Sequence, residues 1–136
     1  MSSCCDPHEY DAVFTSKYAR RTASKLRDSG LDDTAQSMVE FLDSQGLRGA
    51  TVLEIGGGVG GLHMELLRRG ASTATNAELS SAYDAEAARL LDEAGFTERV
   101  TRHIVDLAAN PGALTEADVV VSHRVVCCYP DYRRLL

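Results

Sequence analysis

A cluster of glycines behind an acidic residue is the part of the sequence best suited to bind a ligand. Five of the six positions from Gly56 to Gly61 are glycine, and Glu54 stands two residues before the first of them. The cluster follows an apolar, β-rich segment at residues 50–55 and precedes a segment with helical spacing at residues 62–69. A tight strand-to-helix turn of this kind lets a ligand approach bare backbone, as nucleotide-binding turns do. The alternative interpretation is a flexible turn that binds nothing.

The glycine spacing fits two classes of nucleotide ligand. Gly56, Gly58 and Gly61 match the G-x-G-x-x-G pattern of dinucleotide-binding turns. With Glu54 in front, Gly56, Gly58 and Gly60 also form an E-x-G-x-G-x-G pattern. A carboxylate at the end of a central strand is costly unless it has a partner. The ammonium and sulfonium of S-adenosylmethionine would attract this carboxylate, whereas the pyrophosphate of NAD would repel it. The sequence therefore favours S-adenosylmethionine and leaves NAD as the alternative.

Two more acidic residues follow the next two predicted strands. Glu78 lies 22 positions after Gly56, where nucleotide-binding folds of this type place the acid that binds the ribose hydroxyls. A carboxylate there would also repel the 2′-phosphate of NADP. Asp106 ends the third predicted strand. The alternatives are a solvated glutamate at position 78 and a turn or helix-capping aspartate at position 106.

The segment Val52–Gly60, VLEIGGGVG, resembles the first motif of the class I S-adenosylmethionine-dependent methyltransferases, and the resemblance covers about residues 50–130. It implies that the glycine loop packs against the methionyl and adenosyl parts of the cofactor. It also implies that Glu54 faces the cofactor's amino group, directly or through water. A helix before this motif covers the cofactor in similar proteins, which makes Tyr18, Arg20 and Arg21 further candidates; the alternative for them is a solvated basic face.

The resemblance extends to the residues after the second and third predicted strands. The run Glu78-Leu79-Ser80 is similar to the family's acid, apolar residue and serine at the ribose. In similar proteins the acid at Asp106 accepts a hydrogen bond from the adenine amino group, and the next residue, Leu107, covers the ring. The cofactor-binding residues implied in this way are Glu54, Gly56, Gly57, Gly58, Gly60, Glu78, Leu79, Asp106 and Leu107.

His123 is the candidate catalytic residue. Methyl transfer depends mainly on alignment, and a base is needed only if the acceptor must lose a proton. His123 follows the fourth predicted strand, whose end faces the transferred methyl in this family, and imidazole titrates near neutral pH. The alternative is a structural or solvent-facing histidine. His8, His63 and His103 have no comparable context.

The segment at residues 122–130 restricts the chemical class of the methyl acceptor. It lacks the Asn/Asp-Pro-Pro-Tyr motif of amino methyltransferases that act on nucleic acids or proteins. It also lacks the Pro-Cys nucleophile of cytosine-C5 enzymes, because Cys128 precedes Tyr129-Pro130. We therefore expect O-, C- or S-methylation of a small molecule.

Two predicted helices come first in the sequence, and predicted strands and helices alternate after them. Such alternation predicts an α/β fold, a Rossmann-like, doubly wound parallel sheet preceded by two helices and truncated after its fourth strand. Ligands bind such sheets at the carboxyl ends of the strands, near the point where the strand order reverses. An N-terminal helical cap segment, residues 1–49, would precede an incomplete S-adenosylmethionine-binding core, residues 50–136. Helices are expected at residues 10–28, 33–44, 62–69 and 81–94, and strands at 50–55, 72–78, 99–106 and 118–123.

Composition and charge restrict the partners. The 136 residues are 44% hydrophobic and 25% charged, enough for one domain with a core. The net charge of −6 and the scattered arginine pairs give no basic face for nucleic acid. No apolar run approaches the roughly 20 residues of a membrane span, and the first residues contain no signal peptide, so a cytoplasmic location is expected.

The four cysteines form two adjacent pairs, Cys4-Cys5 and Cys127-Cys128. In the cytoplasm we expect reduced thiols. Cys4 and Cys5 with His8 lack the spacing of a structural zinc site, so no metal is expected.

Three functions remain open at this point: a small-molecule methyltransferase, an NAD-dependent oxidoreductase and a non-catalytic cofactor-binding fragment. An exposed edge on the fourth strand would also make a homodimer a candidate assembly.

Overall fold

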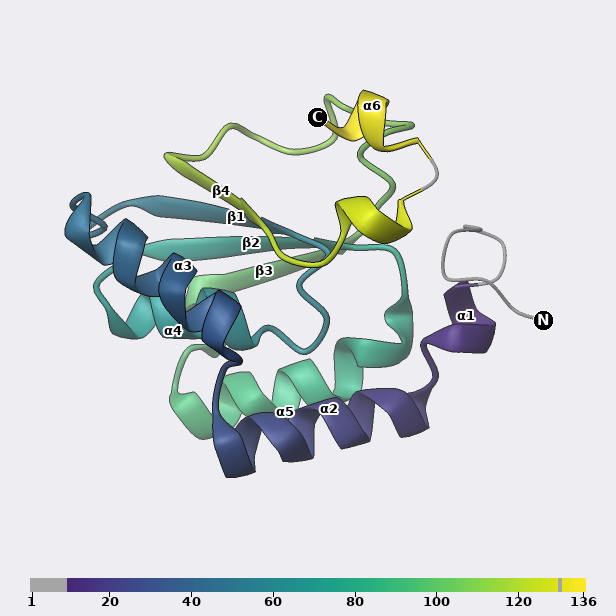
Figure 1. Ribbon diagram of the computed structural model, residues 1–136, viewed down its shortest axis with the longest axis horizontal. Coiled ribbons are helices and arrows are strands. Elements are labelled where there is room, and N and C mark those ends of the chain that lie inside the picture. The colour runs from purple at the N-terminus through teal and green to yellow at the C-terminus, as the bar shows by residue number, and fades with distance from the viewer. Residues whose placement is uncertain (1–9, 130) are drawn as a thin grey trace.

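A four-stranded parallel sheet lies at the centre of the computed structural model, which describes residues 10–129 and 131–136 (Figure 1). The strand order is β3-β2-β1-β4, so the chain moves outward from β1 to β3 and then returns to the other side of β1. The point of reversal lies between β1 and β4, as in Rossmann-like folds. The predicted fold class is therefore confirmed. The strands are β1 (Thr51–Ile55), β2 (Thr73–Glu78), β3 (Val100–Ile104) and β4 (Val119–Ser122).

Four helices of two or more turns cover one face of the sheet. They are α2 (Ser16–Ser29), α3 (Asp33–Ser44), α4 (Gly61–Arg68) and α5 (Asp84–Ala94). Single turns complete the described residues: α1 (Tyr10–Val13), α6 (Tyr132–Leu135), and the 3-10 turns η2 (Ser81–Tyr83), η3 (Thr97–Arg99) and η4 (Val126–Cys128). Within the described part of the chain, no helix is long and apolar enough to cross a bilayer.

The N-terminal helices begin at side-chain caps. The helix expected at residues 10–28 is split, because Thr15 has an extended backbone and its hydroxyl accepts a hydrogen bond from the backbone N–H of Tyr18. This arrangement is a typical N-cap and starts α2 anew. Asp32 caps α3 in the same way, with its Oδ1 2.9 Å from the backbone nitrogen of Ala35.

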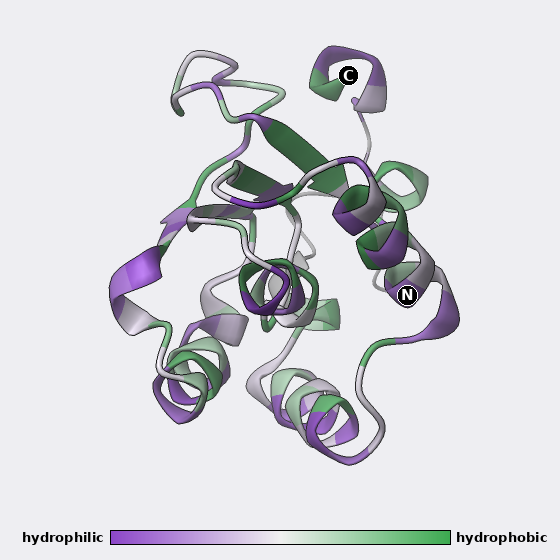
Figure 2. Cartoon of the chain, turned by 90° about the vertical axis from the view of Figure 1, so that its left-hand side faces the viewer, coloured by the Kyte–Doolittle hydropathy of each residue, from purple (hydrophilic) through white to green (hydrophobic). Residues whose placement is uncertain are grey.

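The core lies between the sheet and these helices. Val52, Val121 and Ala74 point from three neighbouring strands into a cluster with α3 and α4, which includes the fully buried Leu66. The connection from β3 to β4 runs on the other side of the sheet without forming a helix (Figures 1 and 2). Val120 is 58% exposed there, so the core lies on the helical face.

The third strand is shorter than predicted. It ends at Ile104 rather than at Asp106. The backbone N–H of Val105 still donates to the carbonyl of Glu78 at 3.0 Å, but the chain then turns, and the N–H of Asn110 bonds back to the carbonyl of Asp106 at 2.9 Å. Asp106 therefore belongs to a turn beyond the strand.

Candidate functional site

A cavity of about 390 Å³ lies at the carboxyl ends of β1, β2 and β4. The glycine loop after β1 forms one side of it and α2 contributes another. Most of the predicted site residues line it: Glu54, Gly56, Gly57, Gly58, Glu78, Leu79, Leu107 and His123. Gly60 and Asp106 do not line this cavity. The fold thus brings together residues that are up to 69 positions apart, from Glu54 to His123.

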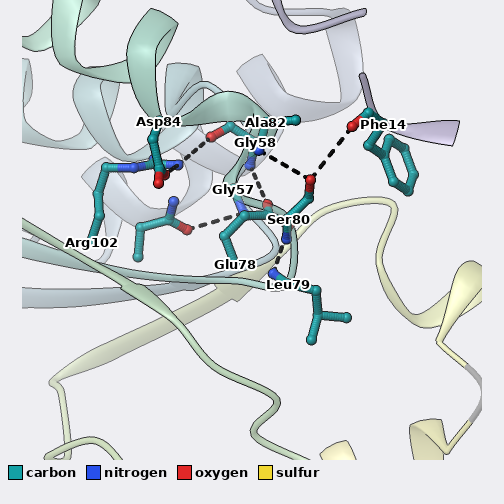
Figure 3. A network of polar contacts seen from close by, with 10 residues as sticks. Phe14, Gly57, Gly58, Glu78, Leu79, Ser80, Ala82, Asp84 and Arg102 are labelled. Carbon is teal, nitrogen blue, oxygen red and sulfur yellow. Dashed lines mark hydrogen bonds and ion pairs between the residues drawn. The ribbon is translucent and has the colours of Figure 1, made fainter. Parts of the chain in front are cut away.

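Glu78 is held by the backbone around it. Its Oε2 accepts a hydrogen bond from the N–H of Gly58 at 2.9 Å (Figure 3). Its Oε1 accepts from the N–H of Leu79 at 2.9 Å and of Ser80 at 3.3 Å. The residue is 8% exposed and lines the cavity. Because each carboxylate oxygen can accept two hydrogen bonds, Oε2 can still accept one from a ligand.

Glu54 is more deeply buried and has a histidine partner. It is 3% exposed, and its Oε1 lies 2.8 Å from Nδ1 of His63 and 3.3 Å from the backbone nitrogen of the same residue. That N–H belongs to the first turn of α4, where helical N–H groups have no partner within the helix. His63 is 0% exposed. His63 was not predicted as a site residue; the signal in the sequence was its place in the first turn after the glycine loop.

Two of the loop glycines leave room for buried polar side chains. A Cβ on Gly57 would lie 2.6 Å from both Oε1 of Glu54 and Oδ1 of Asn76. A Cβ on Gly60, where φ is +94°, would lie 2.7 Å from Nε2 of His63. We expected bare backbone for the approach of a ligand. At these two positions the protein's own side chains already require glycine.

Side chains from β2 and β3 also hold the glycine loop through hydrogen bonds to its backbone. Asn76 is 0% exposed, and its Oδ1 accepts from the N–H of Gly57 at 3.1 Å. Arg102 donates from Nη2 to the carbonyl of Gly58 at 3.1 Å and to Asp84 at 3.4 Å (Figure 3). These residues were also missed, although an asparagine inside a buried strand signals a polar partner.

Three aromatic rings form an apolar part of the cavity wall. The centroids of Phe14 and Tyr18 are 5.6 Å apart, and Tyr83 lies 6.1 Å from Phe14 and 6.4 Å from Tyr18. Burial raises the pKa of Tyr83, and the nearby Glu78 raises it further, so its hydroxyl remains protonated. Of the three candidates from the N-terminal helix, Tyr18 reaches the cavity, whereas Arg20 and Arg21 are exposed outside it.

Asp106 stabilises a turn. Its Oδ1 accepts from the N–H of Ala108 at 3.0 Å and of Ala109 at 3.3 Å, and from the hydroxyl of Tyr129. The neighbouring residues Val105 and Leu107 line the cavity. A contact between Asp106 and adenine stays a prediction.

His123 reaches the cavity from the end of β4 and faces an acid of the N-terminal segment. Its Nε2 lies 3.6 Å from Oδ1 of Asp32, and the guanidinium of the next residue, Arg124, lies 3.5 Å from Oδ2. The pKa of Asp32 is lowered, chiefly by the hydrogen bond from Ala35 and also by the charges of His123 and Arg124, while burial opposes them. Because Asp32 also caps α3, it links the N-terminal helices to β4.

Cys128 lines the cavity, and the neighbouring Cys127 is exposed. Across residues 10–129 and 131–136, no three His, Cys, Asp or Glu side chains are grouped so that they could hold a metal ion. Sγ of Cys127 and Sγ of Cys128 are 3.6 Å apart and are not joined in a disulfide. Cys4, Cys5 and His8 lie outside the described residues.

The strand order and the acidic glycine loop define a class of fold. The chain has the fold of the class I S-adenosylmethionine-dependent methyltransferases, and its four-stranded sheet corresponds to part of those solved chains. No protein-family model and no curated protein matches the sequence, so the relationship rests on solved structures.

Three of these structures illustrate the relationship. A proposed S-adenosyl-L-methionine-dependent methyltransferase from Methanococcus maripaludis has 19% identity and a TM-score of 0.71, over 90% of this chain and 57% of its own. The magnesium protoporphyrin IX methyltransferase of Synechocystis PCC 6803, solved with S-adenosylhomocysteine, has 26% identity and a TM-score of 0.59, over 68% and 42%. A proposed RNA methyltransferase from Pyrococcus horikoshii has 22% identity and a TM-score of 0.60, over 67% and 44%. The chain thus spans about half the length of these neighbours.

Proposed function

We propose that the chain binds S-adenosylmethionine in the cavity and forms the cofactor-binding part of a methyltransferase with a small-molecule acceptor. The observation that carries this proposal is the pair of carboxylates, Glu54 and Glu78, at the ends of two adjacent strands in one cavity. Both are buried and fixed by hydrogen bonds to the protein, and both retain an oxygen that can accept another.

The cavity residues fit the parts of this cofactor. Glu54 offers Oε2, which makes no hydrogen bond within the described residues, to the ammonium group. Glu78 offers Oε2 to the ribose hydroxyls. Leu79 and Leu107 provide apolar surface for the adenine ring. When bound, S-adenosylmethionine supplies an electrophilic methyl group.

Glu54 argues against NAD. Its buried carboxylate at the end of the central strand repels a pyrophosphate, and burial strengthens this repulsion. Glu78 does not discriminate, because an acid at this position can bind the ribose of either cofactor. The loop N–H groups of Gly57 and Gly58 are also occupied, because they donate to Asn76 and Glu78. These two donors are therefore not available to a phosphate group.

His123 is proposed to accept a proton from the acceptor where the acceptor must lose one. It lines the cavity, its side chain is 18% exposed, and Asp32 at 3.6 Å can orient its ring. The acceptor is proposed to be a small molecule, since residues 122–130 lack the motifs of amino methyltransferases that act on nucleic acids or proteins and of cytosine-C5 enzymes. The net charge of −6 also disfavours nucleic acid.

Binding of S-adenosylhomocysteine tests the cofactor proposal. We expect Glu78→Ala to weaken binding by about tenfold or more, because the ribose loses its acceptor and the loop loses its anchor. Glu98→Ala is the matched control, since Glu98 is an exposed glutamate outside the cavity wall. Equal affinity in the wild type and Glu78→Ala would contradict the proposed site.

The acceptor class has a separate test. The chain is incubated with cell extract and S-adenosylmethionine labelled in the methyl group, and products are separated by ultrafiltration. The proposal predicts that label passes a small-molecule filter. Label that is retained and then released by nuclease would favour a nucleic-acid acceptor instead.

A further inference from the structure

Glu54 and His63 form a polar pair that is buried next to the glycine loop. Packing alone does not explain this burial. Glu54 and His63 are 3% and 0% exposed, and they form a 2.8 Å contact between Oε1 and Nδ1. Taking two such groups out of water is costly unless their hydrogen bonds are satisfied or they serve a ligand. Oε1 is satisfied twice by His63, whereas Oε2 makes no hydrogen bond within the described residues.

The two donors of His63 determine which oxygen of Glu54 remains available. The ring Nδ1 and the backbone N–H both bind Oε1, at 2.8 Å and 3.3 Å. A glutamate side chain has several rotatable bonds, so one donor alone would still let the carboxylate turn about the contact. Two donors from different directions fix its plane. The carboxylate then keeps one oxygen against the helix and the other for the cavity that Glu54 lines.

The surroundings of the ring indicate which nitrogen carries the proton. Nε2 of His63 is buried and has no hydrogen-bond partner within the described residues. A proton on Nε2 would bury a donor without an acceptor, which is unfavourable. The tautomer with its proton on Nδ1 satisfies the Glu54 contact and keeps the ring neutral. The Nδ1–H then donates to Oε1 of Glu54, and Oε2 stays available as an acceptor on the side of the cavity.

We infer that His63 is a positioning residue, which holds Glu54 so that its free oxygen binds the ammonium group of the cofactor's amino-acid part. This inference rests on the proposed function. It explains why Gly60 has no side chain, since a Cβ there would lie 2.7 Å from the His63 ring. It also predicts a selective effect, because only ligands with the ammonium group depend on Glu54.

Two ligands and three substitutions test this role. S-adenosylhomocysteine carries the ammonium group, whereas 5′-methylthioadenosine has the same nucleoside without the amino acid. His63→Asn places an amide N–H near the position of Nδ1, while His63→Gln moves the donor and His63→Leu removes it. Each variant is titrated with both ligands by calorimetry, and its folding is checked by circular dichroism.

We expect His63→Leu and His63→Gln to weaken S-adenosylhomocysteine binding by about tenfold, with 5′-methylthioadenosine changed by less than about twofold. His63→Asn should bind both ligands within about threefold of the wild type. If His63→Leu does not fold, the comparison of His63→Asn with His63→Gln still tests whether His63 positions Glu54.

Equal weakening for both ligands, or no weakening of S-adenosylhomocysteine, would overturn the inference, because His63 would then act on the fold as a whole or not at all. Failure of the wild type to bind either ligand would instead contradict the proposed function. The two failures are therefore distinguishable.

Discussion

The two sides of the cavity are built differently. At the ends of β1 and β2, Glu54 and Glu78 are 3% and 8% exposed and are held by contacts of 2.8 to 3.3 Å to nearby groups. At the end of β4, Nε2 of His123 and the guanidinium of Arg124 lie 3.6 and 3.5 Å from the carboxylate oxygens of Asp32. The β1–β2 side is fixed by hydrogen bonds of ordinary length. The β4 side depends on longer contacts between segments that are far apart in the sequence.

This difference indicates that the two sides of the cavity bind different ligands. A site whose groups are already oriented binds a constant ligand with little ordering cost. A side held by long polar contacts, one of them an ion pair to an Arg124 side chain that is 73% exposed, contributes little stability and can adjust. We therefore assign the β1–β2 side to the cofactor and the β4 side to the acceptor. Substitutions on the first side should cost more stability than those on the second.

The largest expected effect is that of Gly60→Ala. The new methyl group would overlap the buried His63 ring, and φ is +94° at this position, so the free energy of unfolding should fall by about 3 kcal/mol. Gly95→Ala is the matched control, since φ is +74° there with nothing within 4 Å of the Cβ position; it should lose about 1 kcal/mol. Urea denaturation measures both, and equal losses would show that the ring is not fixed.

Glu78→Ala should have the next largest effect on stability. It removes the acceptor for three backbone N–H groups, those of Gly58, Leu79 and Ser80. We expect a loss of about 2 kcal/mol, whereas Glu78→Gln keeps one acceptor oxygen and should lose about half as much. Chemical denaturation of the two variants side by side provides the measurement. Wild-type stability in Glu78→Ala would mean that the β2 end is not fixed in advance.

Asp32→Ala removes both a helix cap and the partner of His123. A loss of about 1 kcal/mol is expected, while Asp32→Asn can still cap α3 and should lose less than about 0.5 kcal/mol. Because the folded pKa of Asp32 is lowered, its charge stabilises the protein above its unfolded pKa of about 4. That contribution disappears as the pH falls through the folded pKa. The melting temperatures of wild type and Asp32→Asn should therefore approach each other as the pH falls from about 4 towards the folded pKa; a gap that widens in acid would contradict this.

The smallest effect is expected for Arg124→Gly. Arg124 has φ +58°, which costs a non-glycine residue about 1 kcal/mol, and its ion pair is exposed. Relief of this strain offsets the lost ion pair and the greater freedom of glycine in the unfolded chain. Stability measured by urea denaturation should stay within about 0.5 kcal/mol of the wild type. A loss above about 2 kcal/mol would remove the contrast between the two sides.

Local patterns were predictable and tertiary partners were not. The glycine loop and the acid at the end of β2 depend on neighbours in sequence, so residue type and spacing were sufficient. His63, Asn76 and Tyr83 act through contacts across elements, which a single sequence does not reveal. The end of β3 was misplaced because Asp106 bonds to its own turn and to Tyr129 rather than continuing the strand.

A calorimetric titration of the chain with S-adenosylhomocysteine and, separately, with NADH tests the proposed cofactor. The buried carboxylate of Glu54 predicts binding of S-adenosylhomocysteine, with much weaker or no binding of NADH. Tighter binding of NADH would contradict the proposed cofactor, because a pyrophosphate would then lie in a cavity from which the Glu54 carboxylate should repel it.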